Sequence, residues 1–318
     1  MNKISINGRK YRTISSEDSY AKHLQANHSL ETVRLRNFLT TIFKPHGQYI
    51  FADVGANIGF ISGTIADMFT ESSMHCFEPA AKVFSCLSEN ASQFPNITAN
   101  HCAVGRETTQ ILFHENSAYG HIVKNASTLA GSSLPSVKCV SIADYASSHK
   151  IAKFNFVKVD CEGFELDVFL GLKKRADFIF FEFNPFCISH HYRANPFEVL
   201  QQISESYILY RFHSDTLITR EDNITNLYHD VIVYKSYDDF IAVPRDANIQ
   251  LSAQFALVKH QSRDELLELL YQAILRRPAD PQGSHNIICK HRKLDDDHFV
   301  QAATNDLLFS TERQSMKK

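Results

Sequence analysis

The stretch 49–68 constrains the fold of this chain more than any other. An apolar run at 49–52 ends at the carboxylate of Asp53, and a turn with Gly55 and Gly59 follows before apolar residues recur at helical spacing. A strand, a tight turn and a helix in this order open an α/β fold with a mostly parallel sheet. Ligands of such sheets bind outside the carboxyl ends of the strands, so we expect Asp53 and its turn to meet a cofactor.

The composition of the 318 residues excludes several classes of protein. Hydrophobic residues at 44% and charged residues at 21% are typical of a folded globular protein, and a net charge of -2 gives no basic field for nucleic acid. No apolar run reaches the ~18 residues of a membrane span, and the N-terminus lacks the apolar centre of a secretory signal. Seven scattered cysteines without a CxxC motif predict reduced thiols. We therefore expect a cytoplasmic location.

Alternating strand and helix patterns continue along the chain. Residues 1–15 show little sign of independent structure, and helices are expected within 16–43. Further strands are expected at 74–79, 97–104, 154–160 and 178–183, and further helices at 81–93, 142–149, 166–170 and 197–203. Within residues 105–133 we expect a hairpin followed by a flexible loop. Late strands at 207–212 and 231–234 are expected to pair antiparallel at one edge of the sheet.

Composition shifts divide the chain into four parts. These are an N-terminal helical segment at 1–48, the α/β domain at 49–236, a linker at 237–262 and an all-α module at 263–318. Helices of the module are predicted at 264–276, 284–292 and 296–309. A module of about 55 residues is near the lower size for independent folding, so contact with the main domain or a second chain is expected.

Four carboxylates stand at or near strand ends, at Asp53, Glu78, Asp160 and Glu182. In a parallel sheet these ends share one edge, so the four groups should converge. Convergent carboxylates repel one another unless a cation or hydrogen-bond donors lie between them. Any one of them alone is as readily explained as a helix cap or a turn residue. Together they favour a ligand site.

The turn after Asp53 argues against a dinucleotide. Asn57 and Phe60 stand where the GxGxxG fingerprint needs its second and third glycines, and the chain has no GxxxxGK[ST] motif. S-adenosylmethionine (SAM) fits better, because it has no phosphates but carries an ammonium, a sulfonium and a ribose diol. Asp53 and the turn can meet the amino-acid end, and Glu78 can bind both ribose hydroxyls.

These motifs resemble the FkbM-type SAM-dependent methyltransferases over about residues 45–235. The residues that carry the resemblance are Asp53-Val-Gly-Ala-Asn-Ile-Gly59, Phe77-Glu-Pro79, the pattern Lys158-x-Asp160-x-Glu162-Gly163-x-Glu165, and Glu182. The resemblance implies a class I SAM-methyltransferase fold, which is Rossmann-like with a seven-stranded, mostly parallel sheet. It also implies methyl transfer, usually to a hydroxyl of a sugar, a surface glycan or a secondary metabolite. Cys161 departs from the aliphatic residue often found there.

The C-terminal helices resemble a small domain found behind bacterial methyltransferases and glycosyltransferases that act on surface glycans. Residues 270–277, 280–283 and 309–312 carry this weaker likeness. It implies a glycan acceptor and contact with a glycan-assembly complex or a second copy of the chain.

The site follows from the reaction that the resemblance implies. For the cofactor we expect Asp53, Gly55, Asn57, Gly59, Glu78, Pro79 and Ala103. An acceptor hydroxyl must lose its proton, so a base is needed within hydrogen-bond reach. Asp160 or Glu162 is the first candidate and Glu182 the next, with Lys158 as an orienting group; His190 and His191 are alternatives. No metal ligands are assigned, although an acidic cluster that holds Mg²⁺ is an alternative that we do not expect.

Two other functions stay open at this point. One is a nicotinamide-dependent enzyme that modifies sugars, and the other is a non-catalytic binding or scaffold protein that acts through the helical module. The loop 115–135 is expected either to close over the acceptor or to be a disordered insertion.

Overall fold

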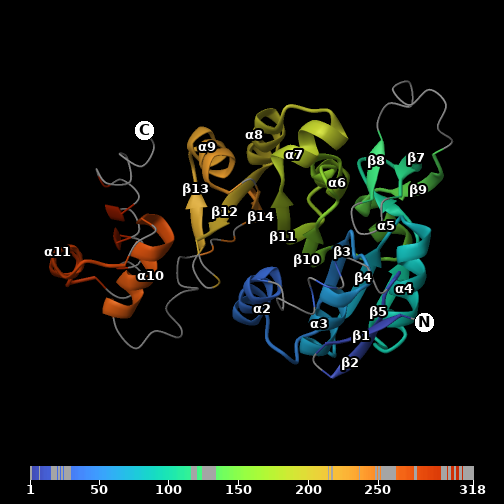
Figure 1. The fold of residues 1–318 in the computed structure, drawn as a ribbon, viewed down its shortest axis with the longest axis horizontal. Coiled ribbons are helices and arrows are strands. Elements are labelled where there is room, and N and C mark those ends of the chain that lie inside the picture. Colours follow the sequence, from blue (N-terminus) through green and yellow to red (C-terminus); the bar gives the residue numbers. More distant parts are fainter. Residues whose placement is uncertain are drawn as a thin grey trace.

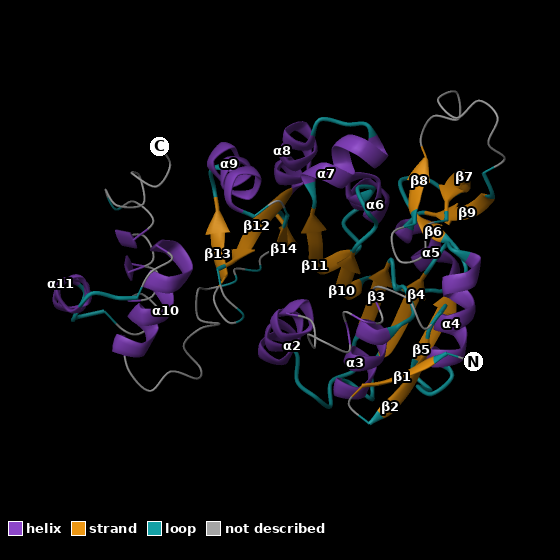
Figure 2. Ribbon diagram, in the orientation of Figure 1, coloured by secondary structure: helices purple, strands orange, loops and turns teal. Residues whose placement is uncertain are grey.

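A single large sheet forms the centre of the molecule, with helices on both of its faces (Figure 1). The computed structural model describes residues 2–6, 8–15, 20, 22, 24, 30–115, 120–123, 134–213, 215, 218–235, 237–247, 249, 251, 263–275, 278–294, 299, 302–303, 306–307 and 310. Strands and helices alternate along the chain as expected for an α/β protein (Figure 2).

The sheet has eight strands in the part of the chain that the structure describes, in the order β13-β12-β14-β11-β10-β3-β4-β5. Strands β5, β4, β3, β10 and β11 run parallel, whereas β14, β12 and β13 are joined by antiparallel pairs. Seven strands were expected, and β13 is the eighth. Their bounds are β3 (Ile50–Val54), β4 (Ser73–Phe77), β5 (Ile97–Asn100), β10 (Phe154–Val159), β11 (Ala176–Phe183), β12 (Tyr207–Phe212), β13 (Ile218–Glu221) and β14 (Asp238–Pro244).

Alternate residues of the strands bury themselves in two separate cores, one on each face of the sheet. Phe180 packs into the first core and its neighbour Phe181 into the second, because successive side chains of a strand point to opposite faces. The first core is covered by α2 (Leu30–Ile42), α3 (Phe60–Met68) and α4 (Ala81–Ala91). The second is covered by α5 (Ile142–Ser148), α6 (Glu165–Leu172), α8 (Pro196–Ser206) and α9 (Ile224–Tyr234). The strand ends between the two helix layers are left free for a site.

The N-terminus is more ordered than the sequence predicted. Residues of the stretch 1–15 form a hairpin, β1 (Lys3–Ile6) with β2 (Arg9–Arg12). Ile6 and Tyr11 are buried against the first core, and the backbone of Arg12 donates a hydrogen bond to Asn90 Oδ1 on α4 at 2.7 Å. The expectation of little structure was wrong because these few apolar side chains find a partner surface far along the chain.

The predicted strand at 97–104 is in fact two strands in different sheets. β5 ends at Asn100, and β6 (Ala103–Val104) joins a second sheet in the order β6-β9-β7-β8. That sheet also contains β7 (Thr109–His114), β8 (His121–Val123) and β9 (Ser136–Val140). The antiparallel pair of β7 and β8 confirms the predicted hairpin. Most of the loop expected at 115–135 lies outside the described residues.

The predicted late strand at 231–234 was wrong. These residues end helix α9, which Asn223 caps by accepting a hydrogen bond from the backbone of Asn226 at 3.0 Å. β12 pairs instead with β13 and with β14, and β14 lies within the stretch predicted as a linker. Its polar start suggested a linker, but the carboxylate of Asp238 is buried against Arg211, 2.8 Å from its Nε. The α/β sheet therefore extends to Pro244 rather than ending near residue 236.

The C-terminal helices lie apart from the main sheet (Figure 1). Helices α10 (Arg263–Leu275) and α11 (Pro281–Lys290) share a small core with Phe299. The third predicted helix, at 296–309, falls largely outside the described residues. Within the described part of the chain, no helix has both the length and the apolar character needed to cross a membrane.

Candidate active site

The turn between β3 and α3 is locked in place by its backbone. Gly55 has a φ of +78°, and a Cβ at this position would lie 1.8 Å from the carbonyl oxygen of Asp160. The amides of Gly55 and Ala56 both donate to the carbonyl of Phe77 at the end of β4. Asn57 has a φ of +50°, and its side chain accepts from the amide of Ile58 at 2.8 Å. Only glycine fits at 55, because the ends of β3 and β10 approach so closely.

Beneath this turn, Asp53 and Lys158 form a buried charged pair. Lys158 Nζ lies 3.9 Å from Asp53 Oδ1 and 3.1 Å from Asp160 Oδ2. Ser62 donates its hydroxyl to Asp53 Oδ2 at 2.5 Å, whereas Oδ1 forms no hydrogen bond with the described residues. Burial raises the pKa of Asp53, and the charge of Lys158 opposes that rise.

Glu78 joins the end of β4 to the same turn. One of its oxygens accepts from the amide of Asn57 at 3.1 Å and the other from the amide of Ala80 at 2.8 Å. Burial raises the pKa of Glu78 to about 7, while these two hydrogen bonds act in the opposite direction. The carboxylate is thus oriented by backbone donors on both sides.

A second group of acids follows the ends of β10 and β11. Burial, with Asp160 and Asp239 adding their charges, raises the pKa of Glu182 to about 9. Burial and the neighbouring Asp160 also raise the pKa of Glu162. These raised pKa values favour the protonated form of Glu182, which can donate a hydrogen bond. Lys158 contacts two carboxylates, Asp53 and Asp160. Asp160 is the more accessible of the two, with 35% of its side chain exposed.

One cavity of 1380 Å³ joins both groups of acids, and we call it the strand-end cavity. It is lined by the predicted residues Asp53, Gly55, Asn57, Glu78, Pro79, Ala103, Asp160, Glu162 and Glu182. Gly59 does not line it: it stands at the start of α3, where an added Cβ would contact Leu87. His191 lines the cavity, but His190 does not.

The hairpin of the second sheet reaches the strand-end cavity. Phe113, Gly120 and Ile122 are among its lining residues. Glu115, at the end of β7, accepts from the amide of Ala81 at 3.1 Å. The described ends of the loop 115–135 thus stand beside the cavity, and its closure over an acceptor stays a prediction.

Several lining residues were missed by the sequence reasoning. Arg34 on α2 extends to Asp239 on β14, with Nη1 3.0 Å from Oδ2, and Lys235 and Tyr237 lie nearby in the chain before that strand. Nothing in the local sequence of α2 connects it with this cavity. Cys187 was also missed, although its spacing of four residues from His191 is visible in the sequence as a helical pair.

The main sheet domain is similar in sequence to known proteins. The profile of a family described as the methyltransferase FkbM domain matches residues 53–213. The hexuronic acid methyltransferase AglP of Haloferax volcanii is 27% identical over 158 residues, which are 48% of this chain and 61% of that protein. The chain therefore spans less than two thirds of the length of this curated relative.

Solved structures of other methyltransferases are also similar. The plantazolicin methyltransferase BpumL has a TM-score of 0.41 at 11% identity, with 73% of this chain and 89% of that chain covered. Magnesium protoporphyrin IX methyltransferase from Synechocystis PCC 6803 has a TM-score of 0.40 at 11% identity, with 72% and 86% covered.

Proposed function

The chain belongs to the FkbM methyltransferase family, and we propose that it transfers the methyl group of SAM to a hydroxyl oxygen of a sugar. The observation that carries this proposal is the strand-end cavity, which joins the turn after Asp53 and Glu78 to the acids Asp160 and Glu182. A cofactor and an acceptor can therefore lie side by side in one cavity. Placing the two reactants together supplies much of the rate of a bimolecular displacement.

The residues of the first half of the cavity fit SAM. Asp53 Oδ1 is a buried carboxylate oxygen that accepts no hydrogen bond from the residues the structure describes, so the ammonium of the cofactor would find a negative partner beneath the turn. Glu78 is held by two backbone donors and keeps lone pairs for the ribose hydroxyls. Ala103 and Pro79 offer apolar surface for the adenine. When bound, SAM supplies an activated methyl group on a cationic sulfur.

We assign the proton-accepting role to Asp160. Lys158 Nζ lies 3.1 Å from Asp160 Oδ2, and an ammonium beside a carboxylate suits a group that accepts a proton. Burial raises the pKa of Glu182, which favours its protonated form, and that form can donate a hydrogen bond to the acceptor. The two acids thus take different roles because their surroundings differ: Asp160 contacts an ammonium, whereas Glu182 is buried beside other acids.

The acceptor that we propose is a hexuronic acid within a glycan. The support is the similarity to AglP, whose name states that it methylates hexuronic acid. The C-terminal helices have a core of their own, and we propose that they bind a second copy of the chain or a glycan-assembly protein. The molar mass of the full chain from light scattering would test whether a second copy binds.

The test begins with the full chain and SAM in a calorimeter, with NADH as the control ligand. Binding of SAM but not of NADH is expected. Isotope-labelled SAM is then supplied with oligosaccharides that contain hexuronic acid or the matching neutral hexose, and products are weighed by mass spectrometry. A gain of one methyl group on the uronic acid acceptor supports the proposal. Absence of SAM binding, or labelling of neither sugar, contradicts it.

A further inference from the structure

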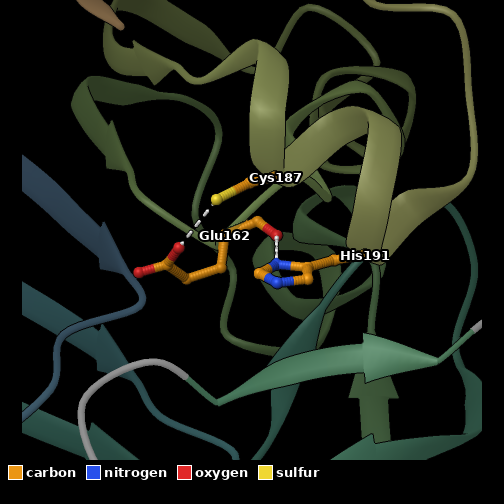
Figure 3. Close-up of side chains that lie close together, drawn as sticks. All are labelled: Glu162, Cys187 and His191. Atoms are coloured by element: carbon orange, nitrogen blue, oxygen red, sulfur yellow. Dashed lines mark hydrogen bonds between the residues drawn. The ribbon is translucent and has the colours of Figure 1, made fainter. Parts of the chain in front are cut away.

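Glu162, Cys187 and His191 meet on the wall of the strand-end cavity (Figure 3). One oxygen of Glu162, the sulfur of Cys187 and one ring nitrogen of His191 all lie within 4.8 Å of one another. Cys187 donates its thiol to Glu162 Oε2 at 3.1 Å. The proposed transfer of a methyl group uses none of the three side chains.

The His191 ring makes a backbone hydrogen bond of the kind that metal-binding histidines make. Its Nδ1 lies 3.1 Å from the carbonyl oxygen of Glu162, which can only accept, so Nδ1 carries the hydrogen and Nε2 keeps a free lone pair. Histidines that bind metals almost always donate their second ring nitrogen to a carbonyl or a carboxylate. His121 stacks on the ring at 4.0 Å between centroids and 9° between planes, which fixes the plane of the imidazole.

The backbone holds the three residues in place through two uncommon conformations. Cys187 ends the short helix α7 (Pro185–Cys187), and the π-helix Ile188–Tyr192 follows it, so Cys187 and His191 project from adjoining turns. Single π-turns are often found at functional sites. Glu162 has a φ of +55°, and a Cβ on the following Gly163 would lie 2.6 Å from the carbonyl of Cys187. The strand end and the helix are therefore packed backbone against backbone.

We propose that Glu162, Cys187 and His191 bind one divalent cation of the Zn²⁺ class, with a fourth position open to the strand-end cavity. One sulfur, one nitrogen and one oxygen ligand suit Zn²⁺ rather than Mg²⁺, which takes oxygen ligands. Neighbouring ligands of a tetrahedral Zn²⁺ lie roughly 3.3–3.8 Å apart, given bonds of about 2.0–2.3 Å. Side-chain movements of about 1 Å would bring the three atoms to this spacing.

The charges around the site favour a cation. Asp160 lines the same cavity as Glu162, so a cation would offset more than one carboxylate. A bound cation takes the place of the thiol proton, which passes to the solvent as the sulfur becomes a ligand.

Metal binding is measured on its own, without SAM or acceptor. The full chain is stripped with a chelator and titrated with Co²⁺, whose absorption reports a thiolate ligand, and Zn²⁺ is then added as a competitor. One equivalent of Co²⁺ should produce a thiolate-to-cobalt charge-transfer band that Zn²⁺ removes. Cys187→Ser should abolish the band, and His191→Asn and Glu162→Gln should each weaken the affinity more than about tenfold, since even the loss of an outer hydrogen-bond partner has effects of 10–100-fold.

Helix α11 provides a matched control. Its exposed Cys289 lies four residues after His285, with Sγ 3.4 Å from Nε2, so it has the same spacing without belonging to the three-ligand cluster. The double variant His285→Asn/Cys289→Ser should keep the Co²⁺ band. Loss of the band in this variant, or its absence from the unmodified chain, would overturn the proposal.

Two further measurements distinguish loss of metal binding from loss of folding. Cys187 is buried, so circular dichroism and thermal melting of the stripped variants show whether each one folds. If Cys187→Ser does not fold, the partly exposed His191→Asn decides, and unchanged Co²⁺ affinity in that variant refutes the site. Any use of the cation in orienting an acceptor hydroxyl rests on the proposed function. Calorimetry with SAM separates the two, because a chain that binds SAM but no metal refutes only the cation site.

Discussion

Lys158 and Asp53 lie opposite each other on the parallel strands β10 and β3, with Nζ 3.9 Å from Oδ1. Only 3% of the Lys158 side chain and 1% of the Asp53 side chain are exposed. A buried charge is tolerated when an opposite charge and hydrogen bonds compensate for the loss of water. Lys158 also contacts Asp160, so one buried ammonium links the cofactor turn to the acid that we assign as the base.

Replacement of this lysine should destabilise the fold. Lys158→Met leaves Asp53 buried without its cation, and removal of one partner of a buried pair costs about 3–5 kcal/mol. The free energy of unfolding in urea measures the effect. Lys82→Met, at an exposed position on α4, should change stability by less than about 0.5 kcal/mol. Adding Asp53→Asn to Lys158→Met should recover part of the loss, and a loss below about 1 kcal/mol for Lys158→Met would refute the compensation.

Glu78→Gln should weaken the binding of SAM. The amide of glutamine presents a donor where Glu78 accepts from the backbone at Asn57 or Ala80, and it offers the ribose hydroxyls one acceptor fewer. A loss of about 10–100-fold in affinity is expected, since each hydrogen bond to a charged group contributes about 1.5–3 kcal/mol. Calorimetry measures it, with the exposed Glu71→Gln as control. Equal affinities in the two variants would remove Glu78 from the site.

Local patterns predicted β3, β4, β10 and β11 well, because each of these strands follows an apolar run and ends at a turn of its own. They failed where distant partners decide the structure. The apolar run at 231–234 fits a strand as well as a helix, and only the contact of Leu227 and Val231 with the second core selects the helix. Asp238 and Asp239 begin a buried strand because Arg211 and Arg34 compensate for their charges, and neither arginine is near in sequence.

The site was predictable to the extent that it lies at strand ends. Asp53, Glu78, Asp160 and Glu182 meet around one cavity because parallel strands end at one edge of the sheet. Arg34 reaches the cavity from a helix that precedes the first parallel strand, and no local pattern reports such a crossing. His191 was considered only as a base, because the helical turn that brings it beside Cys187 was not expected before residue 197.

Two glycines with nearly the same φ distinguish the cost of a left-handed backbone from the cost of a steric clash. Gly55 has a φ of +78° and Gly8 a φ of +79°, but a Cβ at Gly55 would lie 1.8 Å from the carbonyl of Asp160, whereas nothing lies within 4 Å at Gly8. Gly8→Ala should lose only the cost of the left-handed backbone, about 1–2 kcal/mol. Gly55→Ala must also push β3 and β10 apart, so its loss in thermal or urea unfolding should be clearly larger and SAM binding should fail. Equal losses would mean that the turn can move away from Asp160.

Alkaline pH should remove a stabilising contribution that depends on Glu182. The pKa of this group is raised to about 9 in the folded chain, chiefly by burial, from 4.5 for the free side chain. Its contribution to the free energy of unfolding is therefore fully present below about pH 4.5 and is lost as the pH rises to about 9. Glu182→Gln stays neutral throughout. Between pH 5 and pH 9 the free energy of unfolding should fall less in this variant than in the unmodified chain. The two falls should differ by at least about 1 kcal/mol, which corresponds to less than one pKa unit.

Urea unfolding of both proteins at the two pH values measures this difference, and the change common to both proteins cancels. Glu71→Gln, at an exposed position, is the control and should follow the unmodified chain at each pH. Identical pH dependence in Glu182→Gln and the unmodified chain would show that Glu182 is already ionised at neutral pH. In that case it could not donate a hydrogen bond to an acceptor, and the division of roles between Glu182 and Asp160 would fail with it.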